Sequence, residues 1–338
     1  MSEPLKGAIT GAGFFAGFQA EAWNQIDGAN IVAVADPLPG KAREFAAKHE
    51  FAHAYESVDE MLDAEKPDFV DIATRPDSHL DLVKNAAKRG IDVICQKPMA
   101  PTFAESVEMT DYCEEMNVRL LIHENWRWQP WYREIKKLIE AGQIGDRFTT
   151  RFSWRTGDGA GPEPYAHQPY FREMPRLLIY ESLVHLLDTF RYLVGEVESL
   201  TCSINRKNPV IAGEDQATIN LLFENGLTGT IDGDRTNGPF PAPMAMGSLY
   251  ISGTAATLDM DPDGSIMVTP AGNSSRALRF DRPETGYKGE SVLAAQRHYL
   301  DCLRTGQTCE SEGRSYLRTV RLVEACYEAA ATGSTVKV

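Results

Sequence analysis

Two side chains in this sequence have the types and positions needed to move a proton at a hydroxyl group. Lys97 follows the strand-like run 91–96 and precedes a proline, which cannot donate to a strand ladder and so forces the chain out of the sheet. His185 lies four residues after Glu181 and three before Asp188, a spacing that puts all three on one helix face. A histidine accepts protons near neutral pH, and a lysine stabilises negative charge that develops on oxygen. We therefore predict Lys97, His185 and Glu181 as catalytic residues.

Each of these features also has a purely structural interpretation. Lys97 would extend to solvent from an ordinary strand end, and the helix face would be a charged surface stripe or hold a structural histidine. A zinc site built on Glu181 and His185 is weaker, because no further histidine or cysteine cluster lies at ligand spacing, so we expect no bound metal. The six cysteines lack C-x-x-C spacing, which favours neither a zinc knot nor a disulfide framework.

A glycine-rich turn near the N-terminus predicts a dinucleotide site. It has the pattern G-x-G-x-x-A and lies between a short apolar strand, 7–10, and a predicted helix, where backbone N–H groups can bind a pyrophosphate. Asp36 ends the next strand, where it would accept hydrogen bonds from ribose hydroxyls and repel a 2′-phosphate. Pro37 and Leu38 follow it, and no arginine stands beside it to hold such a phosphate, so we expect NAD, with NADP less favoured. The turn comprises Gly11, Gly13, Phe14, Phe15 and Ala16.

Further polar groups follow other predicted strands, and we expect them to line the cofactor site as well. The carboxyl ends of parallel strands meet at one edge of a sheet, which is where ligands bind in open α/β folds. The segment 123–128 could instead be only a linker between domains, with no role at the cofactor site. The candidate cofactor residues are Ala73, Thr74, Pro76 and His79 after strand 69–73, Gln96 and Lys97 after strand 91–96, and Asn125 and Arg127 after strand 118–123.

The elements that position these residues fall into two patterns. Up to residue 125, apolar strands alternate with capped helices, as in a doubly wound parallel sheet of the Rossmann type, so we predict an NAD-binding domain over 1–125. From 126 to 338 the strands alternate polar and apolar residues, and Asn225-Gly226 predicts a hairpin. We expect an α+β domain with an open, mainly antiparallel sheet, and helices at 175–194, 290–304 and 312–331.

Composition excludes several classes of protein. A formal net charge of -14 argues against nucleic-acid and anionic-membrane partners, which need a basic surface. No apolar run approaches the roughly 18 residues of a membrane span. The start of the sequence leaves no room for a signal peptide, and together with the cysteine pattern this predicts a cytoplasmic protein.

A second candidate region precedes the histidine helix. Residues 165–172 are rich in groups that can bind hydroxyls, notably His167 and Gln168, and Arg155 lies at a nearby strand end. We predict these three as substrate-binding residues together with Lys97, Arg127, Glu181 and His185, while an ordinary surface loop remains the alternative for 165–172.

Taken in order along the chain, the motifs described above form a set that is typical of one protein family. The set is Gly11-x-Gly13-x-x-Ala16, Asp36, Ala73-Thr74-x-Pro76-x-x-His79, Lys97-Pro98, Asn125-x-Arg127 and His185-x-x-Asp188, and it covers essentially the whole chain. The chain resembles the glucose-fructose oxidoreductase, inositol dehydrogenase and MocA-like (Gfo/Idh/MocA) family, and within it members that include D-apiose dehydrogenases. The resemblance implies NAD(P)-dependent oxidation of a sugar or polyol hydroxyl, such as C1 of D-apiose to give a lactone. It also implies homodimers or homotetramers formed through the C-terminal sheet.

Two residues depart from the family pattern. Gln96 replaces the usual glutamate before the Lys-Pro pair, and Glu181 replaces the usual aspartate four residues before the histidine. The resemblance implies hydride transfer to the nicotinamide, with His185 taking the hydroxyl proton and Lys97 bonding the same oxygen. Two other functions stay open: a catalytically silent NAD- or sugar-binding sensor, and an enzyme that recycles NAD within elimination or glycoside cleavage.

Overall fold

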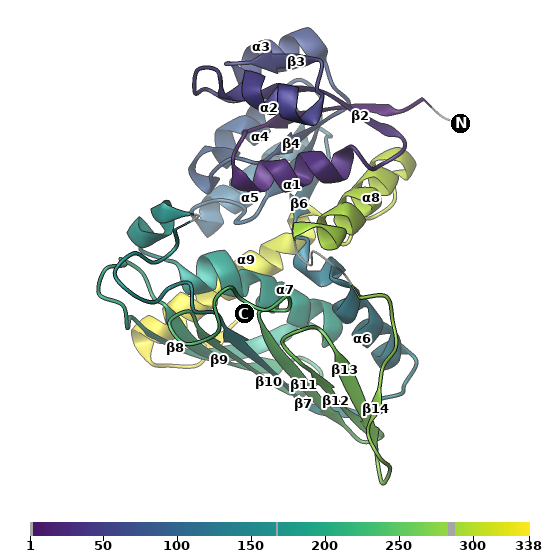
Figure 1. The fold of residues 1–338 in the computed structure, drawn as a ribbon, viewed down its shortest axis with the longest axis vertical. Coiled ribbons are helices and arrows are strands. Elements are labelled where there is room, and N and C mark those ends of the chain that lie inside the picture. The colour runs from purple at the N-terminus through teal and green to yellow at the C-terminus, as the bar shows by residue number, and fades with distance from the viewer. Residues whose placement is uncertain (1–2, 167, 283–287) are drawn as a thin grey trace. The chain divides into compact units, whose positions relative to one another are not determined.

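The computed structural model describes residues 3–166, 168–282 and 288–338 (Figure 1). The chain forms two compact units, Met1–Trp128 with Tyr287–Val320, and Gln129–Gly286 with Arg321–Val338. The predicted boundary at residue 125 lies three residues before this division, and the prediction placed Tyr287–Val320 in the second domain, whereas this segment belongs to the first unit. Helix α8 (Glu290–Thr305) instead packs beside α1 (Phe14–Trp23), where its buried face joins the apolar core of the first unit (Figure 1).

The first unit contains a six-stranded parallel sheet in the order β3-β2-β1-β4-β5-β6. The strand order runs in opposite directions on either side of β1, so the turns after β1 and β4 flank the point where ligands bind in this fold class. This confirms the predicted doubly wound sheet and adds a short edge strand, β3. The strands are β1 (Leu5–Thr10), β2 (Ala29–Ala35), β3 (His53–Tyr55), β4 (Phe69–Ile72), β5 (Asp92–Gln96) and β6 (Leu120–His123).

The helices between these strands begin with the signals that the sequence carries. Thr102 and Glu105 form a reciprocal capping box at the start of α5, and the Ser57 side chain accepts the Glu60 N–H at the start of α3. The remaining elements of this part are α2 (Lys41–His49), α3 (Val58–Glu65), η1 (Pro76–Ser78), α4 (His79–Ala87), α5 (Phe103–Glu115) and η2 (Trp126–Trp128), and α9 (Gly313–Thr332) follows α8.

The second unit is built on a nine-stranded sheet in the order β14-β13-β12-β11-β7-β10-β9-β8-β15. Neighbouring strands are antiparallel except β7 and β10, which pair in parallel, so the predicted mainly antiparallel sheet is confirmed. The strands are β7 (Arg147–Arg155), β8 (Val197–Asn205), β9 (Gln216–Phe223), β10 (Thr228–Asp234), β11 (Gly247–Gly253), β12 (Ala256–Met260), β13 (Ile266–Pro270), β14 (Arg276–Ala277) and β15 (Val336–Lys337).

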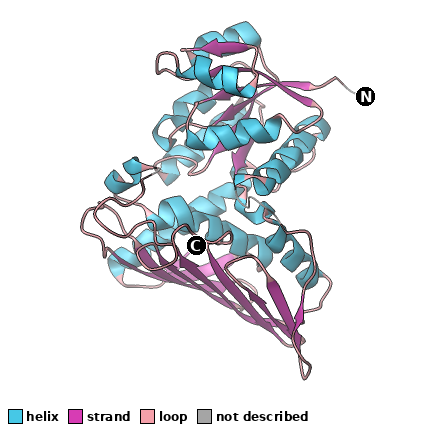
Figure 2. Cartoon of the chain, in the orientation of Figure 1, coloured by secondary structure: helices cyan, strands magenta, loops and turns pink. Residues whose placement is uncertain are grey.

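Helices α6 (Pro130–Glu140) and α7 (Val184–Leu193) lie over one face of this sheet (Figure 2). Residues along β8 and β9 alternate between buried and exposed, as expected when only one face is covered. Within the part of the chain that is described, no helix is both long and apolar enough to cross a membrane.

Candidate functional site

The glycine-rich turn after β1 leaves the start of α1 open. Gly11 has φ +93°, and a Cβ there would lie 2.7 Å from the Ala73 carbonyl oxygen, so both conformation and space require glycine. Gly13 is the N-cap of α1, and among the described residues no side chain caps the helix and a Cβ on Gly13 would meet nothing within 4 Å. Within the described part of the chain, the start of α1 thus offers uncapped helix N–H groups and room beside Gly13, which is the cradle that a pyrophosphate needs.

Asp36 lies at the end of β2 beside this turn. Its carboxylate accepts the Ala12 N–H at 2.9 Å and the Leu38 N–H at 3.0 Å, and Lys41 Nζ lies 3.1 Å away. Burial by itself raises the pKa of Asp36, but these two N–H groups and the Lys41 ammonium lower it overall. Asp36 is thus an ionised acceptor fixed next to the glycine-rich turn.

The turn after β4 is joined to the turn after β5 by His79. Its Nδ1 lies 3.1 Å from the Met99 carbonyl oxygen and its Nε2 lies 3.2 Å from that of Thr74. The ring is fully buried, and burial lowers its pKa. Because both nitrogens face carbonyl groups of the protein, the imidazole positions Thr74 and Pro98-Met99, and its contact with a cofactor stays a prediction. Ala73 and Pro76 belong to the same turn, with Pro76 starting η1.

Lys97 follows β5 directly and is half-buried. The Gln96 side chain turns back so that its Oε1 accepts the Lys97 backbone N–H at 2.8 Å. The Nε2 of Gln96 is buried and has no hydrogen-bond partner among the described residues. A buried, unsatisfied donor costs free energy, and a cofactor ribose or carboxamide oxygen would satisfy it.

Asn125 and Arg127 follow β6, as predicted, but their side chains bond within the first unit. Asn125 Nδ2 donates to Ser291 Oγ at 2.8 Å, and Arg127 Nη1 donates to the Glu310 carbonyl oxygen at 3.1 Å. Both side chains are buried. They fasten the segment after β6 to α8 and to the loop that follows it, contacts that the sequence could not predict across more than 160 residues.

In the second unit, Glu181 and His185 lie on either side of a helix junction. The predicted helix 175–194 consists of a π-helix, Leu178–Leu183, followed by α7. A π turn has more residues than an α turn. Glu181 and His185, which are four residues apart across the junction, therefore lie on nearly the same face of the helix. Isolated π turns are rare and concentrate at functional sites, which agrees with the placement of Glu181 and the buried His185 here.

Glu214 fixes the start of this π-helix. Its carboxylate accepts the Leu177 N–H at 3.2 Å, the Ile179 N–H at 2.9 Å and the Tyr327 hydroxyl at 2.6 Å. Glu214 is itself buried, so these three donors compensate for the cost of burying its charge.

Arg235 organises the groups around Glu181. Its Nη1 lies 3.7 Å from Glu181 Oε2 and donates to Ser182 Oγ at 3.1 Å, while Ser182 donates to Glu181 Oε2 at 2.8 Å. The other edge of the guanidinium pairs with Asp158, and its face lies 4.4 Å from the centroid of the Tyr165 ring. The buried arginine thus links Glu181 to the loop 156–165.

The predicted substrate loop is placed only in part. Tyr165 is buried with φ +59°, a conformation that is uncommon outside glycine and that marks strained, functional segments. Gln168 Nε2 donates to the Tyr170 hydroxyl at 3.0 Å. Arg155 pairs with Asp232 on the neighbouring strand β10. His167 lies outside the described residues.

The sequence analysis missed four residues that the structure places beside the predicted ones. Arg235 carried a signal that could have been used, because it is a charged residue that continues the inward-facing positions of β10, whereas Glu214 continues the outward-facing positions of β9. Lys41 and Lys288 carried none; Lys288 Nζ lies 5.1 Å from the Phe14 ring centroid, far away in sequence from the glycine-rich turn.

Models of known families match both units. The model described as an oxidoreductase family with an NAD-binding Rossmann fold matches residues 5–124, and that of the GFO/IDH/MocA C-terminal domain matches residues 132–259. The D-apiose dehydrogenase of Rhizobium rhizogenes is 37% identical over 341 residues, which cover 99% of this chain and 97% of that protein. That of Paraburkholderia graminis is 35% identical, covering 99% and 90%.

Solved structures agree with this assignment. An oxidoreductase from Agrobacterium radiobacter in complex with NAD+, L-tartaric acid and magnesium is 36% identical, with a TM-score of 0.91 over 98% of both chains. Levoglucosan dehydrogenase in complex with NADH has a TM-score of 0.88 over 99% of both chains but is 22% identical, so it shows the fold alone. The resemblance drawn from the motifs is confirmed, and the chain belongs to the Gfo/Idh/MocA family of oxidoreductases with an NAD-binding Rossmann fold.

Proposed function

We propose that this protein is an NAD-dependent dehydrogenase that oxidises a hydroxyl-bearing carbon of a sugar, with oxidation of D-apiose at C1 to a lactone as the first reaction to test. The observation that carries the proposal is the open, uncapped start of α1 beside Asp36, in a chain that is similar over its full length to two D-apiose dehydrogenases. A polyol is the second substrate class that the family resemblance supports.

The residues present fit NAD. The Gly11–Gly13 turn and the first N–H groups of α1 would hold the pyrophosphate, and Asp36 would accept hydrogen bonds from the adenosine ribose. The unpartnered Nε2 of Gln96 would donate to an oxygen at the nicotinamide end. When bound, NAD supplies the acceptor for the hydride that leaves the sugar carbon.

The proposed roles of the protein groups follow from their chemistry. His185 takes the proton of the substrate hydroxyl, and Lys97 donates a hydrogen bond to the same oxygen while negative charge develops on it. Glu181, oriented by Ser182 and Arg235, accepts hydrogen bonds from other substrate hydroxyls. The sugar thus loses a hydride from the carbon and a proton from its hydroxyl oxygen, a carbon–oxygen double bond forms, and the proton passes from His185 to solvent.

We also propose that the protein works as a cytoplasmic homodimer or homotetramer formed through the C-terminal sheet. The alternating exposed face of β8 and β9 supports the assembly, and six free, buried cysteines support a reducing compartment. Light scattering coupled to size-exclusion chromatography measures the assembly, and a monomeric mass contradicts it.

A panel of aldoses, polyols and inositols with NAD or NADP, followed by the absorbance of the reduced cofactor, tests the reaction. We expect reduction of NAD with a sugar, and a product whose mass is lower by two hydrogens. Binding of cofactor and sugar without turnover would instead identify a sensor. Product formed without net NADH would identify an enzyme that recycles NAD within an elimination or glycoside cleavage.

A further inference from the structure

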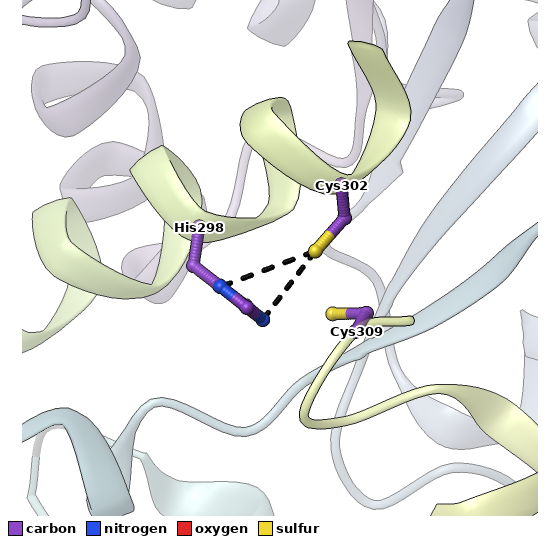
Figure 3. Close-up of side chains that lie close together, drawn as sticks. All are labelled: His298, Cys302 and Cys309. Carbon is purple, nitrogen blue, oxygen red and sulfur yellow. Dashed lines mark hydrogen bonds between the residues drawn. The ribbon is translucent and has the colours of Figure 1, made fainter. Parts of the chain in front are cut away.

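A histidine and two cysteines lie close together in the first unit, and none of the three is assigned above to cofactor or substrate. His298 and Cys302 are one turn apart on α8, and Cys309 lies in the loop after this helix. One ring nitrogen and the two sulfur atoms lie within 4.8 Å of one another. In Figure 3 the imidazole and both sulfur atoms point toward one another. We propose that His298, Cys302 and Cys309 form a zinc(II) site.

The distances suit a tetrahedral ion. With zinc bonds of about 2.3 Å to sulfur and about 2.0 Å to nitrogen, tetrahedral ligand atoms lie ~3.8 Å apart for two sulfurs and ~3.5 Å for sulfur and nitrogen. Cys302 Sγ lies 3.4 Å from His298 Nε2. All three ligand atoms lie within 4.8 Å of one another, so side-chain shifts of about 1 Å bring them to these tetrahedral separations.

The chemistry of the ligands selects the class of metal. Two thiolates and an imidazole are soft or borderline donors, which suit zinc or copper(I) and disfavour magnesium and calcium. Two thiolates balance the charge of a divalent ion in a buried place, and Cys302 and Cys309 are 0% and 2% exposed. His298 is half-buried, so water can reach the cluster and supply a fourth ligand.

The loop that carries Cys309 is already held in place. Arg119 donates to the carbonyl oxygen of Cys302 at the end of α8 and, at 2.8 Å, to that of Gln307, and it pairs with Glu312. The Trp128 ring packs against the His298 ring with centroids 4.8 Å apart. An ion would therefore bind ligands that are largely preorganised, which reduces the entropy lost on binding.

Binding must replace existing hydrogen bonds of the ligand atoms, among them that of Cys302 Sγ to the Thr308 carbonyl oxygen at 3.8 Å. The Glu310 backbone N–H donates to His298 Nε2 at 3.0 Å, and zinc at this nitrogen would take its place. The two thiols release their protons to solvent as the metal–sulfur bonds form. The sequence did not predict this site, because the spacing H-x3-C-x6-C crosses a helix end and matches no common zinc motif.

Zinc content tests the proposal. The full-length protein is stripped with a chelator under reducing conditions, incubated with zinc sulfate, desalted and analysed by mass spectrometry of the metal. We expect close to stoichiometric zinc in the wild type and at least a tenfold lower content in Cys302→Ser and Cys309→Ser. Cys202→Ser is the matched control, because Cys202 and Cys326 are also neighbouring buried thiols but belong to no described metal cluster. A wild type without zinc, or serine variants that retain wild-type zinc, would overturn the proposal.

A second measurement needs no variant, so misfolding cannot confuse it. Cobalt(II) added to the stripped wild type should give the sulfur-to-cobalt charge-transfer and tetrahedral ligand-field absorption of a thiolate site, and zinc should abolish both. Absence of these bands contradicts the site. If peptide mapping instead finds a Cys302–Cys309 disulfide after peroxide treatment, and the reduced protein binds no metal, the cluster is a redox pair and the zinc proposal is wrong.

Discussion

Gln96 Oε1 accepts the Lys97 backbone N–H at 2.8 Å, so the residue that replaces the usual family glutamate fixes the peptide group of the proposed catalytic lysine. Gln96→Ala removes this acceptor and should lower kcat/KM about tenfold, the effect of losing one buried hydrogen bond. Gln96→Glu keeps the acceptor but loses the Nε2 donor assigned to the nicotinamide end, so its kcat should stay within about threefold of the wild type while its KM for NAD rises. Steady-state NADH formation measures both. Equal activity of the alanine variant and the wild type would show that this hydrogen bond does not position Lys97.

Replacing Lys97 itself should separate catalysis from cofactor binding. Lys97→Ala should reduce kcat by about two orders of magnitude or more, because the substrate oxygen loses the group that stabilises its charge. The affinity for NADH, measured by fluorescence titration, should remain nearly unchanged. Lys84→Ala is the control, since Lys84 pairs with Glu108 on the surface of the same unit. If Lys97→Ala turns over as fast as this control, the lysine is not catalytic.

Asp36 and Lys41 together should set the cofactor preference. Asp36→Ser removes the acceptor for the ribose hydroxyls and leaves the Lys41 ammonium, which lies 3.1 Å from the carboxylate in the wild type, available to a 2′-phosphate. KM for NAD should rise about tenfold and kcat/KM for NADP should increase. The double variant Asp36→Ser with Lys41→Ala should lose the gain with NADP. An equal gain in both variants would exclude a role for Lys41.

Arg235 should act on the sugar and not on the cofactor. Arg235→Met leaves Glu181 and Asp158 without their cation, so the KM for the sugar should rise about tenfold or more while the affinity for NADH is unchanged. Arg235→Lys keeps the charge but not the forked geometry and should be intermediate. Arg321→Met, in an exposed pair with Glu328, controls for loss of an arginine. A KM that rises equally for sugar and NAD would indicate a general structural defect.

Asp71 should make the stability of the first unit depend on pH. It is fully buried in β4, accepts hydrogen bonds from Gln19 at 2.9 Å and Trp23 at 2.8 Å, and burial raises its pKa to about 7. An unfolded aspartate ionises near about pH 4, so between about pH 4 and 7 only the folded state keeps the proton. The free energy of unfolding therefore falls as pH rises through this window.

Asp71→Asn should remove this dependence of the free energy of unfolding on pH. Relative to this variant, the wild type should lose up to about 4 kcal/mol of stability between pH 4 and pH 8, the equivalent of about three pKa units. The Gln19 Oε1 has no partner among the described residues, so a turned Gln19 amide could accept a hydrogen bond from the introduced asparagine side chain. Denaturant unfolding at several pH values measures the difference. A constant difference between the two proteins would mean that Asp71 ionises normally in the folded state.

The sequence predicted the elements whose local signals agree with the fold. The strands of the parallel sheet, the capping box at Thr102 and the hairpin at Asn225-Gly226 all follow from patterns within a few residues. The three-residue strand β3 carries too little pattern to be recognised, and α8 joins the first unit through contacts with residues far away in sequence.

The residues of the candidate site also divide into those with local sequence signals and those placed by contacts between distant parts of the chain. Gly11, Gly13 and Asp36 are recognisable because turn geometry and strand spacing constrain them locally. Arg235 could not be linked to Glu181, nor His79 to Met99, because side-chain hydrogen bonds between separate elements leave no periodic trace in the sequence.

The central position of β7 has a consequence for how the second unit assembles. One edge of β7 pairs with β10 and the other with β11, so the earliest strand of the nine-stranded sheet finds no neighbour until chain more than 70 residues later has been made. The meanders β8–β10 and β11–β14 consist of local antiparallel pairs that can form quickly. Strand β7 instead pairs only with strands far along the chain, and such long-range pairing is slow and leaves both edges of β7 unpaired in the meantime. During synthesis, β7 is therefore the segment most open to pairing with another chain and to capture by chaperones.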